Sequence, residues 1–256
     1  MDVEDVRDGL AAAMAGAGSA LGAADRLCRA CVDLLGVDGA SISISDRLTL
    51  SGTFGSSGDL SRRMDEYQFT FGEGPCIDAV SSGAPVLVPD LAAPSHDRWP
   101  AFSSAVLQSG VGAVFALPVA VAMTSVGALD LFNRRTGPLS DAAMQGGLLA
   151  AELAALPLLD VMKSRTDLEG HADGEYGWDE LASLQRVEVY QATGMLINAL
   201  DIDPTEALVR LRANAFARGM TASELAWEIL ERRMDLHDDR LWTSTEAEGD
   251  GPSHDR

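Results

Sequence analysis

The chain has 256 residues, 46% hydrophobic and 23% charged, which suits one or two globular domains with cores of their own. Its 39 acidic and 19 basic residues give a formal net charge of −20, which argues against a general affinity for polyanions. Any nucleic-acid site must therefore be local. Because Lys163 is the only lysine, such a site would be built from arginine.

The sequence favours a cytoplasmic protein with no membrane partner. Pro118 interrupts the apolar run at 111–123, and Glu152 and Pro157 interrupt the run at 148–159, so both fall short of bilayer length. The opening MDVEDVRDGL is acidic where a secretory signal would be basic. Three cysteines are an odd and small set, unlike a disulfide framework.

In chain order, residues 1–20 are rich in Ala, Gly and Asp, and we expect them to be flexible. Apolar side chains at 21–35 follow helical spacing, and Gly36 stops the helix. The segments ASISISD and LTLSGTF then alternate strictly about a turn at Asp46 and Arg47, which predicts a β-hairpin.

A polar segment around 59–67 precedes FGEGPCIDAVSSG, where two glycines make a turn, Pro75 starts a helix and Gly83 ends it. The pattern then predicts a strand at 84–88, a helix at 99–109, strands at 111–119 and 126–133, and a helix from about 140 to 164 that Pro157 kinks or breaks. This order indicates an α+β domain, an antiparallel sheet with helices on its faces.

The polar, acidic segment at 164–179 has the composition of a linker, and three helices are predicted after it. The first runs from about 178 to 200. Asp203, Pro204 and Glu206 supply an N-cap, a first-turn proline and a capping-box acid for the second, which ends at Gly219. Thr221 and Glu224 repeat the capping box for a third helix that ends near residue 236.

Two families resemble these halves. Residues 186–233, with VYQATGML, DPTEAL and LRANAF, resemble an ANTAR domain, a three-helix RNA-binding module of bacterial antiterminators. Residues 21–162, with FGEGPCIDA and LFNRRTGPLS, resemble a GAF domain. The expected organisation is a flexible segment at 1–20, a GAF sensor at 21–162, a linker at 163–178, an ANTAR domain at 179–236 and an acidic flexible tail at 237–256.

The resemblance implies a function in transcription. ANTAR proteins bind pairs of short RNA hairpins in leader transcripts and favour that structure over an overlapping terminator. We therefore expect a regulator whose GAF domain answers a small-molecule signal. We also expect a homodimer formed through the leucine-rich helix at 148–162. The alternative is a ligand-sensing or protein-interaction module whose helical end docks on a protein and binds no RNA.

On the second C-terminal helix, Arg210, Asn214 and Arg218 share one polar face, whereas Leu208, Leu211, Ala215 and Phe216 are assigned to an opposite apolar face. Arg212 falls within the apolar arc, where it must pair with an acid, cross a dimer seam or emerge toward RNA. The expected RNA-binding residues are Arg186, Tyr190, Thr193, Arg210, Arg212, Asn214 and Arg218.

Several features leave this assignment open. Thr193 stands where the ANTAR family commonly has Lys. Residues 181–234 hold six arginines and seven acids, a net charge of −1, so recognition would depend on shape and local contacts. Trp227 and Tyr190 would each stack on a base or pack against protein.

No nucleophile–base pair or metal constellation is found, so we expect neither an enzyme nor a metal site. Cys28 and Cys31 are interpreted as buried structural thiols. Cys76 lies in a first helical turn, where burial competes with redox sensing. No cofactor is expected. The GAF pocket either holds an unidentified ligand or is simply packed, and Phe71, Cys76, Trp99 and Phe102 accordingly line it or fill it.

Overall fold

The structure, a computed structural model, describes residues 3–46, 49–93, 98–168, 186–234, 236 and 242. The chain divides into two units, Met1–Val187 and Glu188–Arg256. Most of the expected linker at 163–178 and tail at 237–256 lies outside the described residues. Residues 163–168 of the expected linker are helical, and in the expected flexible tail the side chain of Trp242 is buried.

The first unit is built on an antiparallel sheet of five strands in the order β2-β1-β5-β4-β3. The strands are β1 Gly39–Asp46, β2 Thr49–Ser56, β3 Val86–Val88, β4 Ala113–Val121 and β5 Thr124–Asn133. The hairpin predicted from alternation is confirmed as β1 and β2, and β4, apolar on both faces, lies inside the sheet as expected. β5 is the middle strand.

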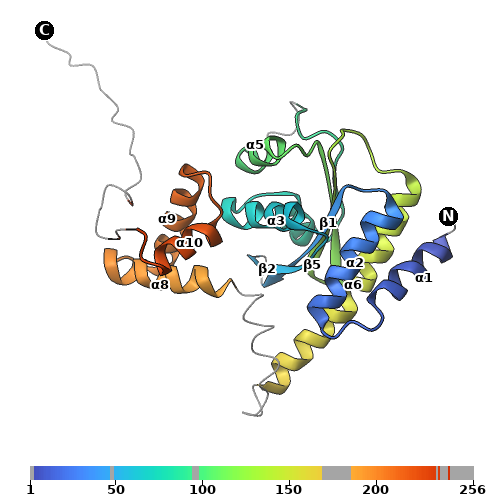
Figure 1. Ribbon diagram of the computed structural model, residues 1–256, viewed down its shortest axis with the longest axis horizontal. Helices are drawn as coiled ribbons and strands as arrows, with labels where there is room; N and C mark the ends of the chain where they lie inside the picture. The colour runs from blue at the N-terminus through green and yellow to red at the C-terminus, as the bar shows by residue number, and fades with distance from the viewer. Residues whose placement is uncertain are drawn as a thin grey trace, which may run out of the picture. The chain divides into compact units, whose positions relative to one another are not determined.

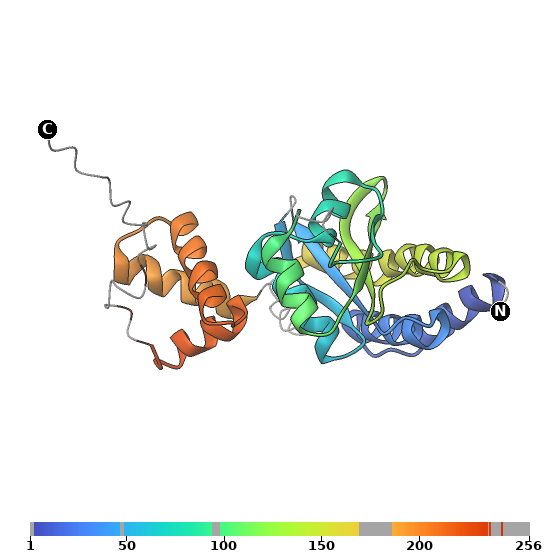
Figure 2. The ribbon, with the colours of Figure 1, turned by 90° about the horizontal axis from the view of Figure 1, so that it is seen from above.

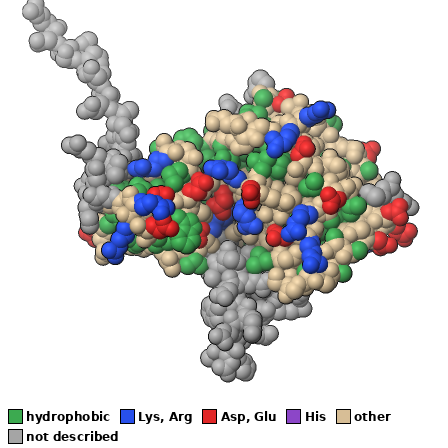
Figure 3. All heavy atoms as spheres, in the orientation of Figure 1, with side chains coloured by type: hydrophobic (Ala, Val, Ile, Leu, Met, Phe, Trp, Pro, Cys, Tyr) green, Lys and Arg blue, Asp and Glu red, His purple; other side chains and the backbone are tan. Residues whose placement is uncertain are grey.

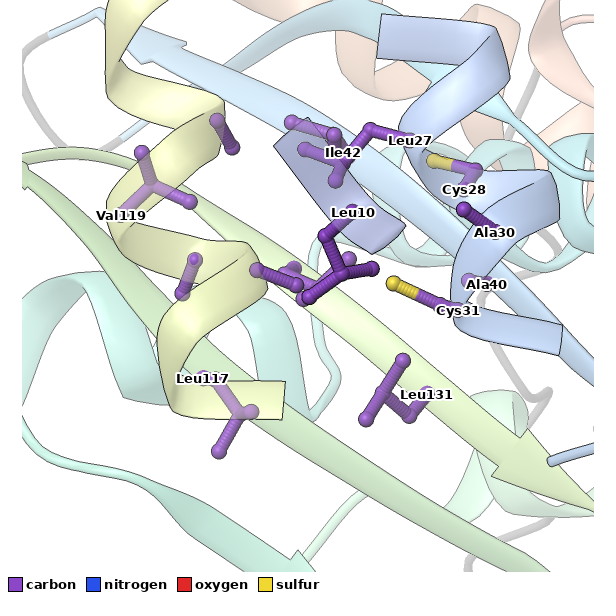
Figure 4. Packing of buried hydrophobic residues seen from close by; sticks show 14 of the residues in the cluster. Leu10, Leu27, Cys28, Ala30, Cys31, Ala40, Ile42, Leu117, Val119 and Leu131 are labelled. Carbon is purple, nitrogen blue, oxygen red and sulfur yellow. The ribbon is translucent and has the colours of Figure 1, made fainter. Parts of the chain in front are cut away.

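Helices cover both faces of the sheet, as Figures 1 and 2 show. On one face lie α1 (Val3–Met14), α2 (Ala20–Leu35) and α6 (Asp141–Leu168). On the other lie α3 (Asp59–Phe71), α4 (Pro75–Ser82) and α5 (Pro100–Gln108). The main apolar core fills the first interface. Figure 4 shows Leu10, Leu27, Cys31, Ile42 and Leu131 pointing into it from α1, α2 and the strands.

The expectation of a flexible segment at 1–20 is wrong. Residues 3–14 form α1, and its Val6 and Leu10, four positions apart and so on one helical face, are both buried. A Cβ on Gly9 would lie 2.9 Å from the Cδ1 atom of Leu34, so α1 packs closely on α2. Tertiary burial therefore orders a segment whose composition alone suggested disorder.

Helix α3 was not predicted, because its buried face is partly polar. Met64 and Phe69 are buried beside Asp65 and Gln68, so no continuous apolar stripe marks the helix in the sequence. Its end at Gly72 and the start of α4 at Pro75 follow the predicted turn.

Helix α6 is continuous across Pro157 and reaches Leu168, so of the two predicted effects of Pro157, a kink or a break, the break does not occur. Ala150, Ala154 and Leu158 are buried in the core of the same unit, whereas Leu148 and Leu156 are exposed. Over residues 141–159 the helix therefore buries one apolar face within the unit. By length and composition Asp141–Leu159 could cross a membrane, which is weak evidence because core helices of soluble proteins pass the same test.

The described part of the second unit holds α9 (Pro204–Ala217), α10 (Ala222–Leu230) and all but the first residue of α8 (Val187–Leu200). The side chain of Asp203 accepts hydrogen bonds from the backbone N–H groups at 205 and 206, at 2.8 and 2.9 Å, which confirms the predicted N-cap. Thr221 and Glu224 form the predicted capping box. Helix α10 ends earlier than the predicted limit near 236.

Candidate functional site

The most unusual part of the first unit is a buried polar cluster on the sheet face that α3 and α4 cover. Strand alternation turns Ile42 toward the apolar core and therefore Ser41 and Ser43 toward the opposite face. Ser41 pairs with Asp130 of β5 across the ladder. We call the following residues the polar cluster: Ser41, Ser43, Thr53, Asp65, Gln68, Cys76 and Asp130.

Asp65 of α3 is fully buried and joins the helix to two strands. Its carboxylate accepts hydrogen bonds from the hydroxyls of Ser43 on β1 and Thr53 on β2. It also accepts a hydrogen bond from Nη2 of Arg186, at 2.9 Å. Three donors from three different segments therefore satisfy this buried carboxylate.

Gln68 lies one helical turn after Asp65 and bridges β5 to α4. Its Nε2 atom donates to Oδ2 of Asp130 at 2.6 Å, and its Oε1 atom accepts the backbone N–H of Cys76 at 2.8 Å. A Cβ on Gly74 would lie 2.4 Å from that Oε1 atom, and Gly74 has a φ of 146°. Glycine at this position therefore lets the chain pass against the Gln68 amide.

The carboxyl group of Asp130 is only partly hydrogen-bonded. Asp130 is 2% exposed, and its Oδ1 atom has no hydrogen-bond partner among the described residues. Burial raises the pKa of Asp130 from 3.8 to about 7, with the Gln68 hydrogen bond opposing and the nearby Asp65 adding to the rise. The carboxyl group therefore changes charge near neutral pH.

Cys76 does not have the lowered thiol pKa that its place at the start of α4 suggested. Burial raises the pKa well above its usual value, and Asp130 and Asp65 raise it further, against smaller opposing effects from Ser43 and Arg186. This thiol is fully buried, as favoured from the sequence. Cys28 and Cys31 are likewise buried and free, and burial raises the pKa of both thiols.

Arg186 is a correction to the expected RNA-binding set. Its side chain is 4% exposed and is held within the first unit instead of facing solvent. Nε donates to Oε1 of Glu66 and Nη2 to Oδ2 of Asp65, both at 2.9 Å, and the guanidinium carbon lies 4.1 Å from the ring centroid of Phe69. Two carboxylates and an aromatic face thus enclose the charge.

The four residues expected to line a sensor pocket separate into two environments. Trp99 and Phe102 are buried in an apolar cluster with Met64, and Phe71 packs against that cluster. Cys76 belongs to the polar cluster. The sequence analysis did not identify Asp65, Gln68 and Asp130 as site residues. One signal was present for Asp130, because it is an acid inside the apolar strand segment LDLF.

In the second unit, the expected polar face of α9 is partly occupied. Nη2 of Arg210 forms an ion pair with Glu206 one turn earlier. The side chain of Glu206, predicted as a capping-box acid, is therefore the partner of Arg210. The side-chain amide of Asn214 donates to the backbone oxygen of Arg210 at 3.0 Å. Arg218, at the C-terminal end of the helix, is exposed.

The remaining expected residues vary in exposure. Thr193 is buried, and the proton of its hydroxyl is donated to the Val189 backbone oxygen at 2.7 Å, within α8. Tyr190 is 60% exposed, and Arg212 is partly buried. Phe216 is 55% exposed, which contradicts its assignment to the apolar core face.

Phe216 is exposed because α9 carries two apolar faces. Ala207, Leu211 and Ala215 repeat every four residues and are buried. Val209 and Phe216 are seven residues apart, so they share the opposite, exposed face. Trp227 of α10 is also more than half exposed.

Charged side chains of both signs are interspersed on the molecular face in Figure 3, without a large basic patch. Within the described ranges, no group of three or more His, Cys, Asp or Glu side chains is placed to hold a metal ion.

A solved GAF domain has a similar architecture. A GAF domain from a Coxiella burnetii phosphoenolpyruvate-protein phosphotransferase is 14% identical, with a TM-score of 0.51, and the alignment covers 65% of this chain and 98% of that one. The corresponding Acinetobacter GAF domain is 15% identical, with a TM-score of 0.49 and coverage of 65% and 99%. A free methionine-R-sulfoxide reductase from Neisseria meningitidis, solved with its substrate, is 19% identical, with a TM-score of 0.46 and coverage of 64% and 91%.

The GAF domain family model matches residues 21–156, more than half of the 256 residues. The chain belongs to the GAF domain family. No curated protein matches the sequence.

The GAF domain is a sensory and signalling module of this chain. Every member of the polar cluster lies inside the matched residues, whereas Arg186 and the helices of the second unit follow them. The GAF domain therefore contributes the acceptors of the buried site, and the segment after it contributes the guanidinium.

Proposed function

We propose that this chain is an RNA-binding regulator in which the GAF domain controls a C-terminal module of the ANTAR type. The module would bind hairpins in nascent leader transcripts and favour them over a terminator. The resemblance of residues 186–233 to ANTAR domains supports this, and so does one observation about the second unit: it exposes Arg218 at the end of α9 and one aromatic side chain on each of its three described helices.

The arginine-bearing face consists of Arg210, Asn214 and Arg218, spaced four residues apart on α9. Arg218 is exposed and suited to a phosphate contact. The Arg210–Glu206 ion pair is a surface pair, and such pairs contribute only about 0–1 kcal/mol, so a phosphate can replace the carboxylate. The pair therefore leaves Arg210 available for RNA.

Exposed aromatic rings supply a second kind of contact. Tyr190, Phe216 and Trp227 are 60%, 55% and 53% exposed. Splayed bases of RNA loops stack on aromatic side chains, at roughly 1–3 kcal/mol for each base. Stacking does not depend on a basic field, so it suits a module whose residues 181–234 have a net charge of −1.

A gel-shift titration with a tandem-hairpin leader RNA tests the proposal. We expect Arg210→Ala and Arg218→Ala each to weaken binding by about tenfold, and to lower the slope of log K against log salt by about 0.8 for each phosphate contact removed. Arg232→Ala removes the same charge from an exposed position after α10 and is the matched control. Equal affinity of all four proteins for the RNA would refute the proposed binding face.

We also propose that the protein acts in the cytoplasm as a homodimer, without catalysis of its own. Leu148 and Leu156 are exposed leucines of α6, eight residues apart, and they offer two apolar contacts to a second copy. Glu152, exposed between them, pairs with Arg7. Light scattering should give twice the monomer mass for wild type and the monomer mass for Leu156→Glu; a monomeric wild type, with and without RNA, would exclude the dimer.

The second candidate function is docking of the helical unit on a protein partner without RNA. The exposed apolar face of Val209 and Phe216 favours it. The two proposals separate in the gel-shift assay. Docking predicts no preference for tandem hairpins over unstructured RNA of the same length, and no effect of Phe216→Ala on RNA affinity. The RNA proposal predicts that tandem hairpins are preferred and that Phe216→Ala weakens RNA binding.

A further inference from the structure

Arg186 sits in an enclosure that has the chemistry of a ligand site. The carboxylates of Asp65 and Glu66 each accept one hydrogen bond from its guanidinium at 2.9 Å, and the Phe69 ring lies 4.1 Å from the guanidinium carbon. Asp65, Glu66 and Phe69, which we call the guanidinium site, all come from α3. A guanidinium differs from an ammonium group because it is planar, donates hydrogen bonds as a fork and stacks flat on an aromatic ring.

The site continues into the polar cluster with acceptors that Arg186 does not use. Oδ1 of Asp130 and Oγ of Ser41 are buried, and neither has a hydrogen-bond partner among the described residues. Their residues face each other across β1 and β5. Ser43, which donates to Asp65, lies two residues beyond Ser41 on the same face of β1. Unused acceptors therefore adjoin the guanidinium site.

The charges at this site require a cation. Among the described residues, the side chains that hydrogen-bond to Asp65 are those of Ser43, Thr53 and Arg186, of which only Arg186 is charged. Removal of the guanidinium would leave a buried carboxylate uncompensated, which is strongly unfavourable. A cation that takes the place of Arg186 must therefore donate hydrogen bonds to the same oxygens.

The backbone at Arg186 indicates that its position is imposed by these contacts. Its φ is 44°, in the left-handed region that non-glycine residues rarely adopt. The second unit begins two residues later, at Glu188. Departure of Arg186 would therefore relieve a strained conformation and free the chain where the second unit begins.

We propose that Asp65, Glu66 and Phe69 form a binding site for guanidinium compounds, that Arg186 occupies it from within the chain, and that a free guanidinium compound replaces Arg186 as the signal of the GAF domain. The last part rests on the proposed sensor function. A second donor on the ligand would reach the unused acceptors of Asp130 and Ser41. The ligand class is thus a guanidinium compound that also carries an amine.

Agmatine is the probe, because it joins a guanidinium to an amine through four methylene groups. Putrescine, which has an amine in place of the guanidinium, is its matched control. In calorimetric titrations of the full chain, agmatine should bind Arg186→Ala at least about tenfold more tightly than wild type, where Arg186 competes, and at least about tenfold more tightly than putrescine binds that variant. Adding Glu66→Gln to Arg186→Ala should weaken agmatine binding by a similar factor.

Several outcomes would overturn the proposal: no agmatine binding to a folded Arg186→Ala, equal binding of agmatine and putrescine, or no effect of Glu66→Gln. If Arg186→Ala is unfolded by circular dichroism, the proposal requires that agmatine and not putrescine restore the fold; failure of that rescue also overturns it. These titrations contain no RNA. Their failure therefore leaves the RNA proposal intact, and loss of the RNA proposal leaves the guanidinium site intact.

Discussion

Asp130 should make the folded GAF domain less stable as the pH rises through neutrality. Burial raises its pKa from 3.8 to about 7. Between these two values the folded state holds a proton that the unfolded state has released, so the free energy of unfolding falls with increasing pH. The stability is fully present below the unfolded pKa of 3.8 and is progressively lost up to the folded pKa of about 7.

The size of the effect follows from the two pKa values. Between about pH 5 and pH 8, ionisation of the Asp130 carboxyl stabilises the unfolded state by the equivalent of roughly 3 pKa units and the folded state by roughly 1. At 1.36 kcal/mol for each unit, the difference is about 3 kcal/mol. Asp130→Asn keeps the shape of the side chain and cannot ionise. We therefore expect this variant to gain about 3 kcal/mol relative to wild type between pH 5 and pH 8.

Urea unfolding, followed by far-UV circular dichroism at both pH values, measures this difference of differences. The other titrating groups are common to wild type and variant, so their contributions cancel. Asp33→Asn, at an exposed position of α2, reports the effect of removing one charge from a chain of formal net charge −20. If Asp130→Asn and wild type change in parallel with pH, Asp130 does not titrate as the fold requires.

Other parts of the fold give further predictions. Leu10→Ala should cost about 2–5 kcal/mol of unfolding free energy, because Leu10 is fully buried, whereas Val3→Ala, at a 45% exposed position of the same helix, should cost about 0.5 kcal/mol or less; similar melting temperatures would show that α1 is not part of the core. Thr221→Ala should cost about 1 kcal/mol in chemical unfolding, through loss of the α10 capping box, and an unchanged midpoint would contradict that role. All three thiols are buried, so iodoacetamide at pH 8 should label the folded chain far more slowly than the urea-unfolded chain; rapid labelling of the native protein would refute their burial.

Where side-chain patterns were strong and local, the sequence alone predicted the elements. Strict alternation in ASISISD identified a strand with an apolar and a polar face, and the caps at Asp203 and Thr221 identified two helix starts. These signals are local because the hydrogen bonds and side-chain spacing that produce them involve residues near one another in the chain. The structure confirms each of them.

The polar cluster had no comparable signal. Asp65 and Gln68 interrupt the apolar face of α3, so the helix resembled a polar loop until the sheet supplied the partners Ser43 and Asp130 from distant positions. Arg186 shows the same limitation: its sequence neighbours suggested an exposed RNA contact, but its carboxylate partners lie about 120 residues earlier in the chain.

The sequence by itself determined the α+β sensor domain, most of its strands and the caps of the C-terminal helices, because each depends on periodicity or on contacts within a few residues. Only the tertiary structure decided that α1 is part of the core, that Phe216 is exposed and that Arg186 is enclosed by α3. Burial and charge compensation depend on residues that meet only when the chain folds, and a linear pattern does not record those meetings.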